Sequence, residues 1–350
     1  MTETSLYRKY RPQNFSEVLG QEHITDTLAQ SIKNNSFSHA YLFSGSRGTG
    51  KTSVARILAR EIGTKPHDLY EIDAASNRGI DDIRELREAV RALPYDSPYK
   101  VYIIDEVHML TKDAFNALLK TLEEPPAHVV FVLATTEPGK VPETIVSRCS
   151  VFQFKQPNVD ILRSTTVDIA KKEGVELEPS SAELIAILGD GSYRDTLSVL
   201  QKVISARTGK KMKAEEVEKL LGAPKLTLLK DFLHHYSEGD TSGTLEVVEK
   251  IKDAGVDVHL FLRLLLSRIR AILLLRYGND FLKKELAKQF SEEELSYLSE
   301  LAKDAKNIHS LTLRDFLEIE PQIALSSIKT LPIEILLLQK GENTERAQEK

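Results

Sequence analysis

A glycine-rich segment carries the residues with the clearest chemistry. Residues 45–52 read Gly-Ser-Arg-Gly-Thr-Gly-Lys-Thr and fit the pattern G-x-x-x-x-G-K-[ST]. Such a loop turns its backbone N–H groups inward around phosphate oxygens, its lysine pairs with the outer phosphates, and its hydroxyl binds Mg²⁺. We therefore expect a nucleotide site, with Thr52 as a metal ligand, formed by Gly45, Ser46, Arg47, Gly48, Thr49, Gly50, Lys51, Thr52 and Ser53.

A pair of carboxylates follows a second apolar segment. Residues 101–104 read Val-Tyr-Ile-Ile and lead into Asp105 and Glu106. Nucleotide hydrolysis needs one acid that holds hydrated Mg²⁺ and another that orients and deprotonates the attacking water. We assign the metal role to Asp105 and the water role to Glu106. His108 completes a D-E-x-H string that also occurs in helicases, but the paired arginine motifs of those helicases are not found.

Three further polar residues could stabilise the charge that develops on an outer phosphate during hydrolysis. Thr136 follows an apolar run, Arg148 precedes the last such run, and Arg194 lies where a helical pattern begins. An isolated arginine is more often a solvated surface residue. Spacing alone therefore does not decide whether each of these arginines has a surface role or a catalytic role.

The chemical positions lie at the ends of short apolar runs that alternate with helical patterns, which predicts an α/β domain over residues 1–156. The runs are almost continuously apolar, as expected for a buried parallel sheet. The predicted strands cover residues 40–44, 69–73, 101–105, 129–134 and 151–154. The predicted helices cover residues 24–34, 52–62, 81–92 and 112–123, the last of which ends before Pro125 and Pro126.

Helical patterns follow residue 156, where the strand signals stop. A small helical domain is expected over 157–223, with helices at 180–188 and 192–206, and a second helical domain over 224–340. The helices of that second domain are expected at 226–236, 245–254, 258–277, 292–305 and 311–324. Arginines interrupt the apolar stretch 260–275, so we expect a buried helix there and no membrane span. The polar segment 341–350 has no apolar face and is expected to be disordered.

Composition narrows the class of protein. A chain of 350 residues with 41% hydrophobic residues can fill two or three cores. Its net charge of −5 argues against a protein that coats nucleic acid with a basic surface, so any DNA contact must be confined to a local basic region. The one cysteine, Cys149, excludes a disulfide framework and a multi-cysteine zinc site. With no secretory signal pattern in the first residues, these features predict a cytoplasmic protein.

Together the motifs resemble the AAA+ ATPases and, within them, the gamma/tau family of bacterial DNA polymerase III clamp-loader subunits. The resemblance is dense over residues 5–223 and weaker beyond, where the helical order still resembles the family's collar domain. It implies a P-loop domain with a parallel five-stranded sheet, a small helical lid domain and a C-terminal helical collar that oligomerises. The matching segments are residues 8–12, 18–23, 39–45, 71–77, 101–126 and 147–149.

The resemblance also implies roles for individual residues. Arg148 matches the arginine finger, which reaches the ATP of a neighbouring subunit. Thr136 matches sensor 1, and Arg194 matches sensor 2, which acts from the lid on the ATP of its own subunit. The positions that border the adenine match Tyr7, Arg11 and Val18. The positions that contact DNA phosphates match Asn77, Arg78, Arg84, Lys140 and Thr144, each of which also reads as a surface loop residue.

The function that the resemblance implies is an ATP-driven, Mg²⁺-dependent motor of the DNA polymerase III holoenzyme, which opens a sliding clamp and loads it onto primer–template DNA. The implied partners are delta-type and delta-prime-type subunits, further copies of this chain, the clamp and the DNA, with no membrane. One alternative is a scaffold that binds ATP without hydrolysing it, like the delta-prime subunit; the intact Lys51, Thr52 and Glu106 argue against it. The other is a different AAA+ DNA motor, such as a branch-migration helicase or a replication-factor-C-type subunit.

Two features depart from the family. Most bacterial relatives insert a four-cysteine zinc module after the helix that follows the phosphate loop, whereas residues 61–68 contain no cysteine, so structural zinc is not expected. Longer relatives continue into domains that bind helicase and polymerase, so we expect either a naturally short form or a part of a longer chain. The sequence leaves open the copy number in the assembly and the self-association of the isolated chain.

Overall fold

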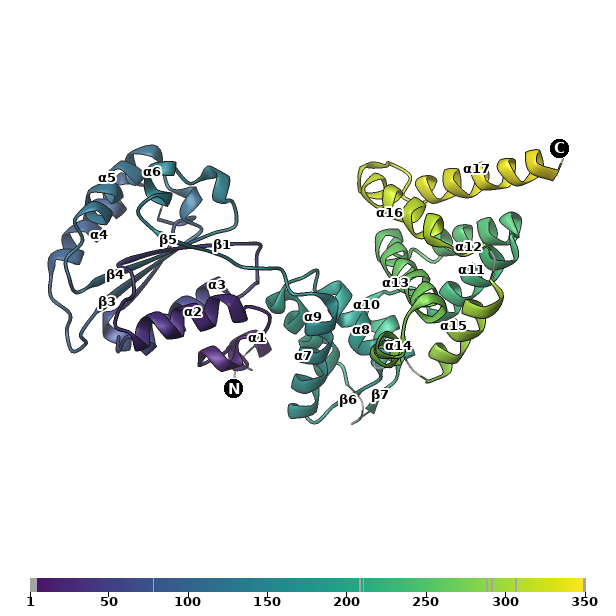
Figure 1. Ribbon diagram of the computed structural model, residues 1–350, viewed down its shortest axis with the longest axis horizontal. Coiled ribbons are helices and arrows are strands. Elements are labelled where there is room, and N and C mark those ends of the chain that lie inside the picture. The colour runs from purple at the N-terminus through teal and green to yellow at the C-terminus, as the bar shows by residue number, and fades with distance from the viewer. Residues whose placement is uncertain are drawn as a thin grey trace. The chain divides into compact units, whose positions relative to one another are not determined.

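The computed structural model describes residues 5–348 except residues 78, 208, 210, 288, 291 and 306. The chain separates into two compact units, one formed by residues 1–162 with 191–198 and the other by residues 163–190 with 199–350. The first unit contains a five-stranded sheet, and the second consists mainly of helices (Figure 1). The domain boundaries expected from the sequence, at residues 156, 223 and 340, remain a prediction.

A parallel sheet forms the centre of the first unit, with the strand order β2-β3-β4-β1-β5. Its strands are β1 Ala40–Ser44, β2 Leu69–Asp73, β3 Lys100–Asp105, β4 Val129–Thr135 and β5 Ser150–Gln153. The predicted strands are thus confirmed to within one residue at each end. Strands β1 and β4 are buried along their whole length, because helices cover both faces of the sheet.

The strand register brings the ends of three strands to one edge of the sheet. Ser44 at the end of β1 is paired with Thr135 at the end of β4, and Ile104 of β3 is paired with Leu133 of β4. All pairs in this sheet are parallel, so the segments that follow β1, β3 and β4 leave from the same edge. Ligands of open α/β sheets bind at this edge.

Helices pack on both faces of the sheet through apolar stripes. Figure 1 shows α2 and α3 on one face and α4, α5 and α6 on the other. Ile24, Val54 and Ile57 pack with Phe43 and Val132 on the first face. On the second face, residues of α4 and α5 pack with those side chains of β3 and β4 that point the other way. The helices are α1 Leu6–Lys9, α2 Glu22–Lys33, α3 Lys51–Glu61, α4 Ile80–Arg91, α5 Lys112–Glu123 and α6 Glu143–Val146, and the 3-10 helices are η1 Phe15–Glu17, η2 Pro66–Asp68, η3 Val107–Met109 and η4 Pro138–Lys140.

The rest of the chain is mainly helical, as predicted. Helix α13 covers the predicted residues 258–277, and helix α9 begins among the residues of the first unit and ends among those of the second. The helices are α7 Val159–Lys172, α8 Pro179–Leu188, α9 Tyr193–Ser205, α10 Ala214–Leu221, α11 Leu226–Glu238, α12 Thr241–Asp253, α13 Val258–Tyr277, α14 Asp280–Ala287, α15 Glu292–Asp304, α16 Ser310–Leu325 and α17 Leu331–Gln348.

Two features differ from the sequence analysis. Two short strands, β6 Glu176–Leu177 and β7 Lys211–Met212, form a parallel pair where no strand was expected, because two residues are too few to give a periodic pattern. The segment expected to be disordered, residues 341–350, is helical as far as Gln348. A helix that has already formed at Leu331 extends at little cost through Glu, Arg, Ala and Gln, which are good helix formers.

The apolar helix α13 is buried inside protein. Within the part of the chain that the structure describes, no helix is both long and apolar enough to cross a bilayer. Arg268 of α13 is 3% exposed and pairs with two buried carboxylates, those of Glu183 at 3.2 Å and Glu294 at 2.9 Å. The arginine that argued against a membrane span is therefore the centre of a buried ion cluster.

Candidate nucleotide-binding site

The glycine-rich loop follows β1 and leads into α3. Gly45, Gly48 and Gly50 all have positive φ angles, of 148°, 74° and 104°. A Cβ atom at Gly45 would lie 2.7 Å from the carbonyl oxygen of Phe154, and one at Gly48 would collide with Ser192. A Cβ atom at Gly50 would meet no atom within 4 Å, so only the backbone conformation requires glycine there. The space beside Gly50 is open to a ligand.

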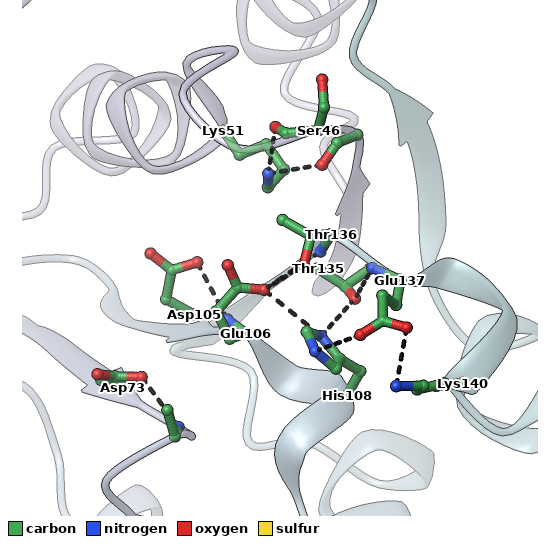
Figure 2. A network of polar contacts seen from close by, with 12 residues as sticks. Ser46, Lys51, Asp73, Asp105, Glu106, His108, Thr135, Thr136, Glu137 and Lys140 are labelled. Atoms are coloured by element: carbon green, nitrogen blue, oxygen red, sulfur yellow. Dashed lines mark hydrogen bonds and ion pairs between the residues drawn. The ribbon is translucent and has the colours of Figure 1, made fainter. Parts of the chain in front are cut away.

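Lys51 lies inside the curve of this loop. Its Nζ donates to the carbonyl oxygens of Gly45 at 2.7 Å and Ser46 at 2.9 Å (Figure 2). Lys51 is 6% exposed. Burial lowers the pKa of Lys51, and the carboxylates of Glu106 and Asp105 oppose that shift. A buried ammonium group held only by carbonyl oxygens gains a stronger partner when an anion enters the loop.

The two predicted metal ligands contact each other. The Thr52 hydroxyl, in the first turn of α3, donates to Asp105 Oδ2 at 2.9 Å. Asp105, at the end of β3, also accepts a bond from the backbone N–H of Glu106 at 3.0 Å. A hydroxyl and a carboxylate are oxygen ligands of the kind that Mg²⁺ prefers, so this pair fits the expected ion.

Across the residues with described positions, no group of three or more His, Cys, Asp and Glu side chains could hold a metal ion. The expectation about structural zinc remains a prediction.

Glu106 has a left-handed backbone, with a φ angle of 48°, which is uncommon for a residue that has a Cβ atom. Its Oε2 accepts bonds from Thr136 N at 3.2 Å and from Thr136 Oγ1 at 2.9 Å (Figure 2). Thr136 directly follows β4, the neighbour of β3 in the sheet. The structure therefore joins the predicted water-orienting acid to the predicted sensor residue.

The first turn of α9 meets the phosphate loop and the N-terminal segment. Tyr193 N donates to the carbonyl oxygen of Gly48 at 3.0 Å, and the Tyr193 hydroxyl donates to that of Leu19 at 2.8 Å. The guanidinium carbon of Arg194 lies 5.9 Å from the centre of the Tyr7 ring. Of the predicted adenine-side residues, Tyr7 thus lies beside Arg194.

The other two adenine-side residues have different environments. Val18 is buried in the apolar core that also contains Ile24 and Phe43. Burial lowers the pKa of Arg11, and Arg56 and Arg194 add to the shift.

Arg148 is held by groups outside the phosphate loop. Its Nη2 lies 2.6 Å from Glu123 Oε1, and its Nη1 donates to the carbonyl oxygen of Thr144 at 2.7 Å. The side chain of Arg148 is 34% exposed. These contacts are those of a surface residue, and the arginine-finger role remains a prediction.

The predicted DNA-contacting residues Asn77, Arg84, Lys140 and Thr144 are all exposed. Arg84 pairs with Asp81 at 3.0 Å, and Lys140 pairs with Glu137 at 2.8 Å. Asn77 donates from its side chain to the carbonyl oxygen of Asp73 at 3.0 Å. Arg78 lies outside the described residues. Exposure fits a phosphate-contacting role for the four described residues, and the role remains a prediction.

Sequence reasoning missed several residues that line the site. Thr135 and Glu137 flank Thr136 and contact His108, and Ser192 and Tyr193 contact the phosphate loop. The D-E-x-H string was the available signal for His108. The neighbours of the other residues depend on the order of strands in the sheet, which the sequence pattern alone does not contain.

The arrangement defines a class of protein. A glycine-rich loop after β1, an acid pair after β3 and a polar residue after β4 gather at one edge of a parallel five-stranded sheet. With the helical part that follows, this is the fold and site of an AAA+ P-loop protein. A solved RuvB Holliday junction branch migration motor from Thermotoga maritima matches with a TM-score of 0.52 and 22% identity, covering 65% of this chain and 78% of the RuvB chain. That likeness reflects the shared fold.

Sequence comparisons identify the particular family. A family model described as DNA polymerase III, delta subunit, matches residues 20–71 and 63–158, and one described as DNA polymerase III subunits gamma and tau domain III matches residues 212–335. DNA polymerase III subunit tau of Bacillus subtilis is 43% identical over 278 residues, which are 73% of this chain and 49% of the relative. The tau subunit of Escherichia coli is 43% identical over 238 residues, which are 62% of this chain and 37% of the relative.

The chain belongs to the gamma/tau family of bacterial DNA polymerase III subunits. It spans about half the length of the curated relatives from Bacillus subtilis and Mycobacterium that it matches.

Proposed function

We propose that this chain is the ATP-hydrolysing motor of a clamp loader, which opens a sliding clamp and loads it onto primer–template DNA during replication. The observation that carries the proposal is the 2.9 Å hydrogen bond between Thr52 and Asp105, with Glu106 next in the chain. It joins the phosphate loop to the acid pair, so the groups that bind a nucleotide and those that activate water lie in one site. Membership of the gamma/tau family supports the wider role.

The phosphate loop binds the nucleotide. Its backbone N–H groups, freed by the glycines, donate to phosphate oxygens, and Lys51 exchanges the carbonyl oxygens of Gly45 and Ser46 for the outer phosphates. Thr52 and Asp105 would hold Mg²⁺, which neutralises charge on the phosphates when it is bound. Arg47, Thr49 and Ser53, which the sequence also predicts as nucleotide-binding residues, would contribute to the same phosphate-binding site.

Glu106 orients and deprotonates the attacking water, because it lies directly after the metal-ligand position and one of its oxygens is fixed by Thr136. Its other oxygen makes neither of those bonds and can accept from the water. Thr136 thereby acts as the sensor that sets the angle of Glu106. Arg194 and the adenine-side residues Tyr7, Arg11 and Val18 complete the site within one subunit.

Arg148 completes the site of a neighbouring subunit. Its partners Glu123 and Thr144 lie outside the phosphate loop of its own chain. Hydrolysis then depends on assembly with further copies of the chain and with delta-type and delta-prime-type subunits. Asn77, Arg78, Arg84, Lys140 and Thr144 contact the phosphates of primer–template DNA, and the protein works in the bacterial cytoplasm.

A second candidate is a scaffold that binds ATP without hydrolysing it. The match of residues 20–158 to the delta-subunit family model favours this reading. The contact of Thr52 with Asp105 and the placement of Glu106 against Thr136 favour hydrolysis. Turnover measurements distinguish the two.

The test compares two variants of the full chain. Lys51→Ala is expected to abolish ATP binding, because it removes the buried cation of the loop. Glu106→Gln is expected to bind ATP normally and to lower turnover by about a hundred-fold or more, because the water loses its base. Binding is measured with a fluorescent ATP analogue and turnover by phosphate release, in the assembly with clamp and primed DNA. A Glu106→Gln variant that turns over at the wild-type rate would remove Glu106 as the base, whereas a wild-type chain that binds ATP without any turnover would support the scaffold reading.

A further inference from the structure

Tyr193 joins two segments of the proposed nucleotide site to the start of α9. Its hydroxyl donates to the carbonyl oxygen of Leu19 at 2.8 Å, and its backbone N–H donates to that of Gly48 at 3.0 Å. Leu19 directly follows a residue that is expected to border the adenine, and Gly48 belongs to the phosphate loop. One residue thus holds the base side and the phosphate side of the site through two separate bonds.

The segment that accepts the hydroxyl bond, residues 18–21, is fixed at both of its ends. Val18 is buried in the apolar core, and Gln21 is fully buried just before α2. The side-chain amide of Gln21 donates to the carbonyl oxygen of Lys155 at 2.6 Å and accepts from the backbone N–H of the same residue at 3.1 Å. Between these two anchors, the Tyr193 hydroxyl holds the carbonyl group of Leu19.

The middle of this segment exposes an apolar side chain and packs closely against Tyr193. Leu19 is 44% exposed, whereas Val18 is 8% exposed. Gly20 has a φ angle of 70°, and a Cβ atom there would lie 3.1 Å from Ile161 Cδ1 and 3.5 Å from the Tyr193 hydroxyl. The turn at Gly20 therefore brings the backbone close to Tyr193 and leaves the leucine side chain accessible to a flat apolar group such as a nucleobase.

The Tyr193 hydroxyl is a neutral donor. Burial raises the pKa of Tyr193, and the carboxylate of Glu22 adds to the shift. The phenol therefore keeps its proton at neutral pH, and the bond to Leu19 is one between uncharged groups.

The two bonds from Tyr193 can be separated by substitution. Phenylalanine removes the hydroxyl bond to Leu19 but keeps the ring and the backbone bond to Gly48. Without the hydroxyl bond, the base-side segment must be ordered when a nucleotide binds, and the free energy of that ordering reduces the affinity. The phosphate loop keeps its contact with α9, so the binding of phosphate groups alone is expected to stay the same.

We propose that Tyr193 is a positioning residue that fixes the base-side segment, residues 18–21, so that its hydroxyl strengthens binding of the nucleoside part of ATP and ADP without acting on the phosphates. The inference rests on the proposed function and names the group that orders the base side of that site before the nucleotide arrives. Its effect lies in affinity, because the groups assigned to the chemical step lie at the ends of β3 and β4.

The experiment measures equilibrium binding of the full chain to ATP, to ADP and to inorganic tripolyphosphate, each by displacement of a fluorescent ATP analogue whose own Kd is measured for every variant. Tyr193→Phe is expected to raise the Kd for ATP and ADP by about three- to ten-fold, which is the value of one hydrogen bond between neutral groups. Its Kd for tripolyphosphate, which has neither base nor ribose, is expected to stay within about two-fold of wild type. In the assembly, the KM for ATP should rise while kcat stays within about two-fold.

Tyr41→Phe is the matched control. The Tyr41 hydroxyl also makes a hydrogen bond to the backbone, accepting from Ser38 N at 2.8 Å near the start of β1, whereas the phosphate loop follows the end of that strand. Both substitutions are expected to lower the unfolding temperature. Tyr41→Phe is expected to leave the Kd for ATP unchanged, so a general loss of stability is distinguished from a loss of positioning.

A double variant tests whether the hydroxyl acts through Leu19. Leu19→Ser alone is expected to weaken ATP and to leave tripolyphosphate unchanged, because it removes the exposed apolar side chain beside the base. Leu19→Ser with Tyr193→Phe is expected to bind ATP about as weakly as Leu19→Ser does, since positioning serves little once the side chain is gone. Independent effects that multiply would contradict this route.

Two results overturn the inference: a Kd for ATP that Tyr193→Phe does not change, or losses of equal size for ATP and for tripolyphosphate. The second result would place the effect of the hydroxyl on the phosphate loop. Both leave the proposed function intact, which is contradicted instead if wild type does not hydrolyse ATP or if hydrolysis survives Lys51→Ala.

Discussion

Gly50 is a residue at which the backbone alone requires glycine. Its φ angle is 104°, and no atom lies within 4 Å of the place where a Cβ atom would stand. Gly50→Ala is expected to lower the free energy of unfolding by about 1–3 kcal/mol, because a left-handed backbone strains any residue with a Cβ atom. Urea denaturation measures the change.

Gly139→Ala is the matched control for this substitution. Gly139 also has open space around it and has no left-handed φ angle. Its replacement is expected to change the free energy of unfolding by no more than about 0.5 kcal/mol. Equal effects at the two glycines would show that the φ angle of Gly50 carries no cost.

Thr136 contributes one side-chain bond and one backbone bond to Glu106. Thr136→Val keeps the shape and the backbone bond but removes the hydroxyl, so kcat is expected to fall by about ten-fold with little change in the KM for ATP, as for the loss of one bond to a charged group. Thr136→Ser keeps the hydroxyl and is expected to retain most of the activity. Wild-type kcat in the valine variant would remove Thr136 from the catalytic step.

At the scale of elements, helices α8, α13 and α15 meet at Arg268. The guanidinium group is buried with Glu183 of α8 and Glu294 of α15, both of which are also buried. Arg268→Met is expected to lower the free energy of unfolding by about 3–5 kcal/mol, because it leaves two buried carboxylates without their cation. Arg270→Met, at an exposed position of α13, is the control and is expected to cost no more than about 0.5 kcal/mol.

The same cluster predicts a dependence of stability on pH. Burial raises the pKa of Glu294 above its ordinary value of 4.5; Glu183 adds to the shift and Arg268 opposes it. A raised pKa in the folded state means that the folded protein holds this proton more tightly than the unfolded chain does. The contribution of Glu294 to stability is therefore fully present below pH 4.5 and is lost as the pH rises through the folded-state pKa.

Glu294→Gln removes this titration. Between pH 4.5 and 7 the free energy of unfolding of wild type is expected to fall relative to that of the glutamine variant, as measured by urea denaturation at each pH. Glu292→Gln, at an exposed position of the same helix, is expected to follow wild type. A constant difference between wild type and Glu294→Gln would contradict the raised pKa.

At the scale of the whole molecule, Arg148 is expected to act on a neighbouring copy of the chain. Arg148→Ala should bind ATP with wild-type affinity and lose hydrolysis in the assembly, by about a thousand-fold or more, as for other arginine fingers. Mixing the variant with wild type should lower the turnover per wild-type site, because some wild-type sites then face a neighbour without the finger. Phosphate release at several mixing ratios measures this effect.

Glu123→Gln separates the finger role from the surface ion pair. This substitution removes the partner of Arg148 at 2.6 Å and leaves the guanidinium group in place. Hydrolysis is expected to stay at the wild-type level or above it. If Glu123→Gln loses as much activity as Arg148→Ala does, then the ion pair itself is what matters.

The sequence predicts most of the elements and part of the site. Buried parallel strands are short and almost continuously apolar, so their bounds were predicted to within one residue. The phosphate loop and Asp105 were predictable because glycine, lysine and carboxylate carry their chemistry in the residue type. The contact of Thr52 with Asp105 confirms that these two segments meet.

The rest of the site depends on contacts that no local pattern contains. The bond from Thr136 to Glu106 requires β3 and β4 to be neighbours, and the position of His108 between Glu106 and Glu137 depends on three short segments at once. The pairing of Arg268 with Glu183 and Glu294 joins three helices. Periodicity places an arginine in a helix but does not give its partners.

The left-handed backbone of Glu106 has opposite consequences for stability and for catalysis. Glycine and asparagine adopt a φ angle of 48° at a lower conformational cost than glutamate does. The backbone at this position therefore favours a residue that cannot act as the base. If variants are selected in the laboratory for thermal stability alone, without selection for ATP hydrolysis, we expect glutamate to be replaced at position 106 sooner than aspartate at position 105. Persistence of the acid under such conditions would have to come from the two bonds that Thr136 donates to it.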